Sequence, residues 1–293
     1  MSTVLPDDLV ETGWLESHFQ LPSLRVVDIR GYVHTTDQGE GRQSATYAGA
    51  REEFDAAHIP ESVFVDWTED IVDPAAEVAA QIAPPDRFKL AMERIGVGDA
   101  TDVVVVDHAG GHFATRLWWA LRYYSHDRVA VLDGGFAKWQ TEERPLTSDP
   151  AQPRSVTFTP TPRPDLRRDA NQVQAAIGAE TDVIVDARDE GQYSGATQRG
   201  SRGGHIPGAI NLPAKNLMVG GVWKPLAEQR ALVEAAGIQP EQTVTAYCNG
   251  GVTATAVLFA LHRLGHERTA NYDGSWNEWG ERSDLPVEGN RNL

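Results

Sequence analysis

The chain has 293 residues, enough for one large domain or two ordinary ones, and 41% hydrophobic and 23% charged residues are typical of a globular protein. The formal net charge of −16 argues against nucleic-acid and anionic-membrane partners, which need basic patches, and the lack of an 18-residue apolar run excludes a membrane span. A single cysteine excludes an intramolecular disulfide. It fits a reducing cytosol, and the first residues lack the basic and apolar regions of a secretory signal, so a cytoplasmic location is expected.

Short apolar runs alternate with helical stretches through the first half of the chain. Helices are expected at residues 5–19, 85–95 and 115–124, and strands at residues 25–30, 102–107 and 129–132. The strand that ends at Asp107 continues into a loop with two glycines, and the strand after it leads to a turn at Asp133. These signals indicate strands and helices in regular alternation.

The same order of elements returns in the second half. An Asp-x-Arg strand end, a His-Ile-Pro segment, a strand entering a glycine loop and an Asp-Gly turn all recur. The paired positions are Asp28 and Asp186, His58 and His205, Asp107 and Cys248, and Asp133 and Asp273. Four landmarks in unchanged order indicate a duplication in which each copy has its own core. We therefore predict domains at residues 1–147 and 165–293, joined by a proline-rich linker at residues 148–164.

Each copy shows the pattern of an α/β fold. Val- and Ile-rich strands that alternate with helices imply right-handed β-α-β crossovers, and hence a mostly parallel sheet flanked by helices on both faces. In open parallel sheets, ligand sites lie at the carboxyl ends of the strands. The cleft between the two domains is therefore the expected place for a substrate.

The only cysteine, Cys248, stands between a predicted strand and an apolar helix, in a loop with two glycines. Such a loop directs successive backbone N–H groups to its concave side, with the positive end of the helix dipole behind them. A thiolate gains hydrogen bonds and a favourable field there, so Cys248 is the candidate nucleophile. The alternative is a buried structural cysteine, which a Gly-Gly loop disfavours because it packs poorly. Asp107 cannot act as a thiol nucleophile, so the first domain is expected to be non-catalytic.

Taken together, these motifs resemble the tandem-domain rhodaneses, the thiosulfate/3-mercaptopyruvate sulfurtransferase family. The resemblance covers nearly the whole chain. It is carried by Cys-x-x-Gly-Val-Thr-Ala at Cys248, the Asp-x-Arg strands, Gly-His-Ile-Pro-Gly-Ala at residues 204–209, Tyr-Asp-Gly-Ser-Trp-x-Glu-Trp at residues 272–279, and Asp107 in place of cysteine. It implies two rhodanese-like domains, of which only the second is catalytic.

The implied activity is transfer of a sulfane sulfur from thiosulfate to a thiophilic acceptor through a persulfide on Cys248. The acceptor is cyanide, a thiol or a reduced thioredoxin-like protein, and no cofactor is expected. The alternative donor is 3-mercaptopyruvate, used by the same route. A third possibility is a non-catalytic sulfur carrier or interaction module, in which Cys248 turns over no donor.

Donor binding is expected to involve the loop and two arginines. The predicted residues are Asn249, Gly250, Gly251, Val252, Thr253, Arg199 and Arg188. Relatives that prefer thiosulfate carry a basic residue at the position of Gly250, and those that prefer mercaptopyruvate carry a serine there. Relatives also place a donor-binding arginine at the position of Gln192. A second such arginine of mercaptopyruvate-type relatives corresponds to Arg199 or, alternatively, Arg202, whereas Arg188 better suits an ion pair at its strand end.

Two other site types are weighed and set aside. His108 and His112 have the i,i+4 spacing of metal ligands, but they flank a glycine loop without a third ligand on a rigid element, so no metal is expected. A cysteine phosphatase also uses a thiolate between strand and helix. Its loop needs an arginine at the position of Ala254, and this loop is too short for a phosphoryl group.

Overall fold

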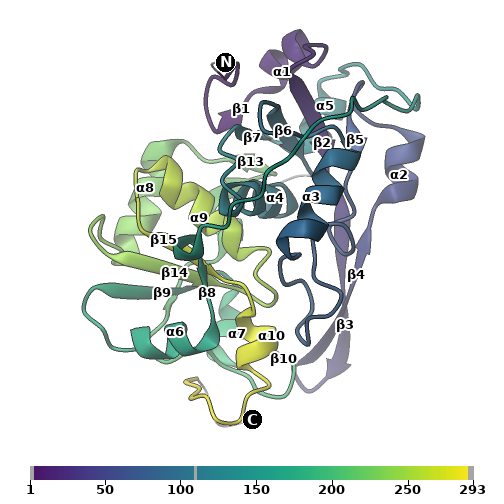
Figure 1. Cartoon of the computed structure of the whole chain (residues 1–293). Coiled ribbons are helices and arrows are strands. Elements are labelled where there is room, and N and C mark those ends of the chain that lie inside the picture. The colour runs from purple at the N-terminus through teal and green to yellow at the C-terminus, as the bar shows by residue number, and fades with distance from the viewer. Residues whose placement is uncertain (1–2, 109–110, 290–293) are drawn as a thin grey trace.

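The computed structural model describes residues 3–108 and 111–289 and consists of two α/β halves with the same topology (Figure 1). Each half is built on a five-stranded sheet whose strands are all parallel, with the orders β1-β7-β6-β2-β5 and β11-β9-β14-β15-β8. When the second order is read in reverse, each strand of the first sheet has a counterpart at the same place in the second sheet. The predicted fold class, two parallel-sheet units of the same design, is therefore confirmed.

The first sheet has a short strand at each edge and fully buried strands in its centre. Its strands are β1 (Leu9–Val10), β2 (Leu24–Asp28), β5 (Val63–Phe64), β6 (Asp102–Val106) and β7 (Val129–Leu132). The accompanying helices are α1 (Thr12–His18), α2 (Arg51–Ala56), α3 (Pro85–Arg94), α4 (His112–Tyr123) and α5 (Gly135–Thr141). All five residues of β2 and of β6 are buried, as expected for strands covered on both faces.

The second half repeats this plan. Its strands are β8 (Arg167–Arg168), β9 (Asp182–Asp186), β11 (Ile210–Asn211), β14 (Thr243–Tyr247) and β15 (Thr269–Tyr272). The helices are α6 (Ala170–Ala176), α7 (Glu190–Ser194), α8 (Leu226–Ala235), α9 (Ala254–Arg263) and α10 (Ser275–Trp279). Two 3-10 turns (Pro164–Leu166 and Ala214–Leu217) and an antiparallel pair, β12 (Met218–Val219) with β13 (Val222–Trp223), complete it.

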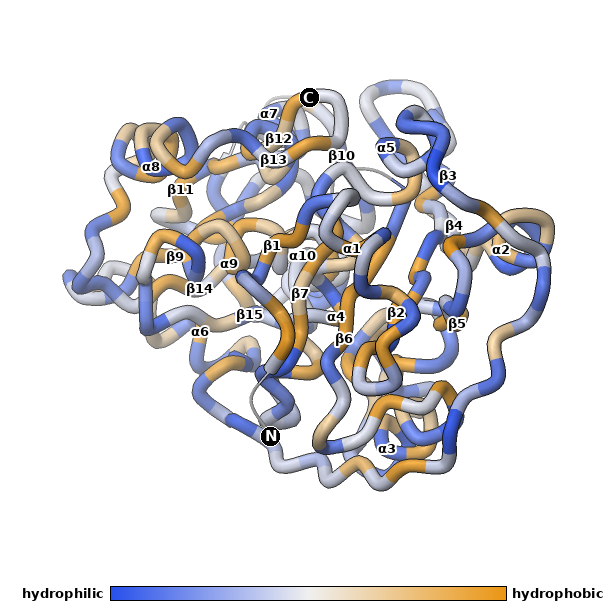
Figure 2. The backbone as a smooth tube through the Cα atoms, turned by 90° about the horizontal axis from the view of Figure 1, so that it is seen from above, coloured by the Kyte–Doolittle hydropathy of each residue, from blue (hydrophilic) through white to orange (hydrophobic). Residues whose placement is uncertain are grey.

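Helices cover both faces of each sheet, and the two inner faces share one core. Helices α4 and α9 are buried on almost every side and pack against each other, with Trp118 meeting Phe259 edge to face at 5.0 Å between ring centroids. Helices that are apolar all round need such a central position. The prediction that each copy has a core of its own therefore holds only for the outer faces. Figure 2 shows the apolar residues concentrated along β2, β6 and β7, whereas β3 is largely hydrophilic.

Two segments differ from the sequence-based expectation. The helix expected at residues 5–19 forms only from Thr12 to His18, because Leu9 and Val10 pair with β7 as an edge strand. The polar segment after β2 forms a long hairpin, β3 (Gly31–Gly39) and β4 (Arg42–Gly49), that reaches over to the second half (Figure 1). There β4 pairs in parallel with β10 (Gln198–Arg199), so the two halves share a three-stranded sheet.

The connection between the halves is extended. Residues 151–163 form neither helix nor strand, and Phe158 inserts into the core of the first half beside Phe88, at 5.7 Å between ring centroids. In the described part of the chain, no helix is both long and apolar enough to cross a membrane.

Candidate active site

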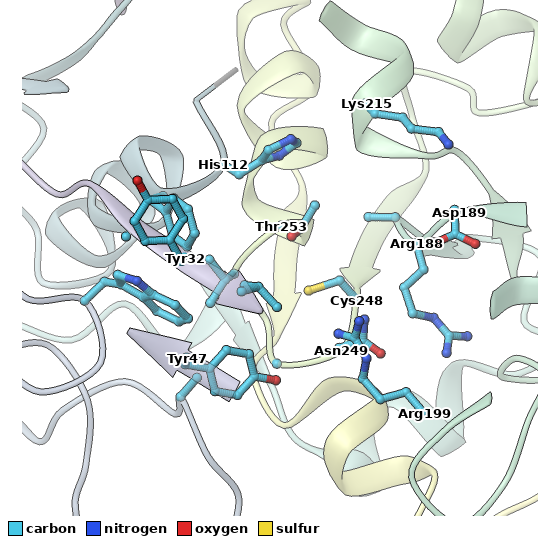
Figure 3. Close-up of a pocket in the computed structure, with 18 of the residues that line it drawn as sticks. Tyr32, Tyr47, His112, Arg188, Asp189, Arg199, Lys215, Cys248, Asn249 and Thr253 are labelled. Atoms are coloured by element: carbon cyan, nitrogen blue, oxygen red, sulfur yellow. The ribbon is translucent and has the colours of Figure 1, made fainter. Parts of the chain in front are cut away.

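A cavity of about 590 Å³ lies between the two halves and contains Cys248 (Figure 3). The second half contributes Cys248 and its loop, together with side chains from three neighbouring segments. The first half contributes the strands of the hairpin, the start of α4, and residues from the loops that follow β5 and β6. The lining includes Tyr32, Tyr47, Trp67, His112, Phe113, Arg188, Asp189, Gln192, Arg199, Lys215, Cys248, Asn249, Gly250, Val252 and Thr253. The predicted interdomain cleft thus exists, and the cysteine opens into it.

Cys248 follows β14 directly and is held by the segment that begins α10. Its side chain is 3% exposed, yet its sulfur points into the cavity, as Figure 3 shows. Its backbone N–H donates to Ser275 Oγ at 3.1 Å, and its carbonyl accepts from the Trp276 N–H at 3.0 Å. The cysteine therefore sits on a fixed backbone with its thiol facing the space where a substrate would bind.

Three carbonyl groups of the Cys248 loop accept hydrogen bonds from residues on the side of the loop opposite the cavity. Trp276 donates to the Cys248 carbonyl, Asn277 to the Asn249 carbonyl at 2.8 Å, and the Asn271 side chain to the Gly251 carbonyl at 2.9 Å. Because a peptide unit is planar and trans, the N–H of the following residue points the opposite way, toward the cavity side.

The N–H groups oriented in this way belong to Asn249, Gly250 and Val252. We call these three groups the anion nest. They find no acceptor among the described residues. Helix α9 begins at Ala254, immediately behind, and adds the positive end of its dipole.

Gly251 makes this geometry possible, although it does not line the cavity. Its φ of +71° lies in the left-handed region, and a Cβ built on it would lie 2.8 Å from the Asp273 carbonyl oxygen. Only glycine meets both conditions without strain. Thr253, the last residue before α9, returns to the cavity lining.

The structure gives a role to Gln192, which stands where an arginine is expected from the resemblance. Gln192 is buried on α7, the helix that follows β9, and its Oε1 accepts from Asn249 Nδ2 at 3.0 Å. This contact fixes the Asn249 side chain beside the cysteine and leaves Asn249 Oδ1 buried without a partner. The position where relatives carry an arginine therefore holds a residue that orients the loop.

Arg188 forms its polar contacts with groups near the end of β9 rather than with the cavity. Its guanidinium pairs with Asp186 at 2.6 Å, donates to the Gly204 carbonyl at 2.7 Å and lies 4.3 Å from the centroid of the Trp276 ring. Burial opposes its charge, but Asp186 outweighs burial and raises the pKa of Arg188. Arg30 and Asp28 form the same pair in the first half, at 2.9 Å, where no cysteine exists. The pair thus has a structural role, and donor binding by Arg188 stays a prediction.

Arg199 and Arg202 lie in different environments. Arg199, on β10, lines the cavity, donates from Nη2 to Thr35 Oγ1 at 3.1 Å, and has a buried Nε without a partner. Arg202 donates to four backbone carbonyls of the segment from Trp279 to Leu285. Arg199 thus brings a guanidinium group to the cavity lining, whereas Arg202 holds the C-terminal segment.

Lys215 is a cavity cation that the sequence analysis missed. It lies on the 3-10 turn after β11, is exposed, and lines the cavity (Figure 3). Nothing in the local sequence marks it, because its position depends on how the turn packs against α9.

Aromatic side chains of the first half form the opposite wall. The ring centroid of Trp67 lies 5.4 Å from that of Tyr47 and 4.9 Å from that of Phe113. Tyr32 and Tyr47 line the cavity on the side facing Cys248 (Figure 3). His112 also lines the cavity, and burial lowers its pKa below the ordinary 6.5 despite the nearby charge of Asp107. In residues 3–108 and 111–289, no three His, Cys, Asp or Glu side chains gather as a metal site requires.

Comparison with known proteins gives the family. The model of the rhodanese-like domain matches residues 11–142 and again residues 169–282. The chain belongs to the rhodanese-like family. The 3-mercaptopyruvate sulfurtransferase of Escherichia coli K12 is 31% identical over 282 residues, which cover 95% of this chain and 97% of that protein. The thiosulfate sulfurtransferase of Rattus norvegicus is 32% identical over 291 residues, covering 96% and 94%.

Other comparisons agree with this assignment. The rhodanese-fold crystal structure of SseA from Escherichia coli superposes with a TM-score of 0.80 at 29% identity, covering 92% of this chain and 98% of that one. The sulfur carrier protein TtuD of Thermus thermophilus is 31% identical over 300 residues, covering 96% of both chains. The predicted rhodanese resemblance and the predicted enzyme class, a sulfurtransferase, are confirmed.

The first rhodanese-like domain shows what such a loop binds. The Asp107 carboxylate accepts from the N–H groups of Gly111 at 3.2 Å, Phe113 at 3.0 Å and Ala114 at 3.2 Å. The Asp107 carbonyl accepts from Phe136 N–H at 2.8 Å, just as the Cys248 carbonyl accepts from Trp276. The rhodanese loop of the first domain is therefore filled by its own anion.

Proposed function

We propose that the protein is a thiosulfate sulfurtransferase that carries the transferred sulfur as a persulfide on Cys248. The observation that carries this proposal is the anion nest, whose N–H groups lack an acceptor in the described chain and belong to the loop of a cysteine that opens into a cavity. The equivalent loop of the first domain is occupied by the Asp107 carboxylate, so this type of loop is able to hold negative charge. A persulfide on Cys248 would bring the corresponding anion to the second loop.

The reaction consists of two displacements at sulfur. The Cys248 thiolate attacks the outer sulfur of thiosulfate, the S–S bond of the donor breaks, and sulfite leaves with the electron pair. The acceptor nucleophile then attacks the outer sulfur of the persulfide, and the Cys248 thiolate leaves with the electron pair of the broken bond. The anion nest stabilises the negative charge on the persulfide between the two steps.

Donor recognition is proposed to come from the cavity walls. Position 250 is narrow, since a Cβ there would lie 3.2 Å from Asn277 Nδ2 and 3.5 Å from Ala80 Cβ, and glycine carries no charge. Arg199 and Lys215 face the same cavity and supply two cations for sulfonate oxygens. Asn249 to Thr253 would contact the donor through their backbone groups.

The second candidate donor is 3-mercaptopyruvate, with pyruvate as the leaving product. The observation in its favour is that residues 249–253 contain no basic side chain, while Arg199 lines the cavity with a guanidinium group suited to a carboxylate. Cyanide, a small thiol or a thioredoxin-like protein would accept the sulfur. We place the protein in the reducing cytosol, where a single unpaired thiol persists. A non-catalytic carrier remains the third candidate.

Intact-mass spectrometry tests the proposal. The protein is treated separately with thiosulfate and with 3-mercaptopyruvate, and then with cyanide. We expect a gain of one sulfur atom that cyanide removes as thiocyanate, and no gain in the Cys248→Ser variant. The faster donor at equal acceptor concentration identifies the substrate. No gain with either donor would reject the enzyme, and a gain without turnover would favour the carrier.

A further inference from the structure

The non-catalytic domain inserts one arginine behind the catalytic loop. Arg116, on α4, is 1% exposed, and its Nη1 donates to the Gly251 carbonyl at 3.1 Å and pairs with Asp273 Oδ1 at 2.7 Å. Its Nη2 donates to the Ala80 carbonyl at 2.7 Å, and the guanidinium lies 4.6 Å from the centroid of the Trp119 ring. One buried side chain thus joins α4, the segment at Ala80 and the loop of Cys248.

The surrounding interface is otherwise nearly symmetric. Thr115 on α4 and its counterpart Thr255 on α9 contact each other, with 2.9 Å between their hydroxyl oxygens. Asp133 accepts from the Trp223 N–H of the second half, and its counterpart Asp273 accepts from the Ile82 N–H of the first half, both at 2.9 Å. Each domain therefore touches the Asp-Gly turn of the other in the same way.

Arg116 breaks this symmetry. The residue after Thr255 on α9 is Ala256, which cannot reach across to the Asp107 loop as Arg116 reaches the Cys248 loop. The Asp107 loop has no need of such a residue, because its own carboxylate orients three N–H groups. The arginine is present only on the side where the loop must keep its N–H groups unoccupied.

We infer that Arg116 is a positioning residue for sulfur transfer: by holding the Gly251 carbonyl back, it turns the Val252 N–H toward the sulfur of Cys248. The Gly251–Val252 peptide needs this support because glycine allows its peptide units to rotate easily. Asn271 supplies a second donor, but Arg116 is the donor fixed by an ion pair with Asp273. The inference rests on the proposed function, in which the anion nest stabilises the reacting sulfur.

The test follows the alkylation of Cys248 by iodoacetamide as a function of pH, which needs no sulfur donor. In Arg116→Lys, the ammonium can still pair with Asp273 but cannot form the two-pronged contact. We expect the profile to move to higher pH and the rate at pH 7 to fall roughly tenfold, the effect of one lost hydrogen bond to an anion. Arg122→Lys, on the same helix and paired with Asp127, should follow the wild type.

The kinetics of sulfur transfer distinguish a positioning role of Arg116 from a merely structural one. Arg116→Lys should lower kcat for sulfur transfer with little change in KM, while a merely structural role would leave the alkylation profile unchanged. If the lysine variant does not fold, Arg116→Gln is judged by the same criterion. A folded variant with the wild-type alkylation profile would overturn the inference, even if the wild type transfers sulfur. A shifted profile in a protein that loads no sulfur would leave the positioning role intact and reject the proposed function.

Discussion

The loops after β6 and β14 both connect a parallel strand to a buried helix, but an aspartate begins the first loop and a cysteine begins the second. In the first, the Asp107 carboxylate fills the space between strand and helix and accepts three backbone N–H groups. In the second, no side chain fills the loop in this way, and the N–H groups of the anion nest have no acceptor in the described chain. The comparison supports our proposal that both strand–loop–helix units can bind an anion: the first holds the carboxylate of Asp107, and the second would hold a persulfide formed on Cys248.

The two domains also divide the work around the cavity. The second provides the thiol, the nest and the cations, and the first provides the aromatic wall and the buried Arg116. The first domain thus contributes to the cavity around the thiol of the second.

The largest expected effect separates the two loops directly. Cys248→Ala should lower sulfur transfer by more than about 10³-fold, because no other residue can carry the persulfide, and should leave the fold intact. Asp107→Ala should keep transfer within about threefold but lower the free energy of unfolding by about 1–3 kcal/mol, because three buried N–H groups lose their acceptor. Steady-state rates and denaturant melts measure both. If both variants lost sulfur transfer to the same extent, the claim that only the Cys248 loop is catalytic would be wrong.

Gly251→Ala should have the next largest effect. The new Cβ would meet the Asp273 carbonyl oxygen, and the left-handed backbone alone costs about 1–2 kcal/mol, so the nest should distort and kcat/KM should fall about tenfold or more. Gly237→Ala is the matched control, since Gly237 has a φ of +81° but open space around it. It should lose stability and keep its transfer rate. A Gly251→Ala variant with normal kcat/KM would show that the loop geometry is not needed.

Donor binding should respond to Arg199 more than to Arg202. Arg199→Ala should raise KM for thiosulfate about tenfold with a smaller change in kcat, as expected when one charged hydrogen bond to the donor is lost. Arg202→Ala should act mainly on the melting temperature, because its donors hold backbone carbonyls. An unchanged KM in Arg199→Ala would move the anion site to Lys215 or Arg188.

The smallest effect concerns pH and the loop of the first domain. Burial lowers the pKa of His112, so the unfolded chain takes up a proton at this residue at a higher pH than the folded protein does. The wild type should therefore lose stability relative to His112→Val as the pH falls below 6.5, and the difference between them should be constant above about pH 7.5. Melting temperatures between pH 5 and 8 measure this. A difference that is independent of pH would show that His112 keeps its ordinary titration in the folded protein.

The sequence allowed the duplication, the parallel sheets and the loop at Cys248 to be predicted, because all three depend on local patterns. Strands rich in Val, two glycines and an apolar helix define the loop within a few residues. The local pattern predicts a helix at Leu9 and Val10, because nothing in the nearby sequence shows that β7 has an open edge with which they pair.

The contacts across the interface could not be predicted in this way. Arg116 lies 135 positions from Gly251, and the hairpin that carries Tyr32 and Tyr47 reaches the cavity only after pairing with β10. Lys215 enters the cavity from an irregular turn. Such residues acquire their neighbours only when the two domains pack, so no spacing in the chain reveals them.

A crystal structure of the protein after treatment with thiosulfate tests the central claim most directly. We predict electron density for a second sulfur on Cys248 Sγ, within hydrogen-bonding distance of the N–H groups of Gly250 and Val252, and an unchanged Asp107 loop. An outer sulfur directed toward the aromatic wall, with those N–H groups bound elsewhere, would contradict the account.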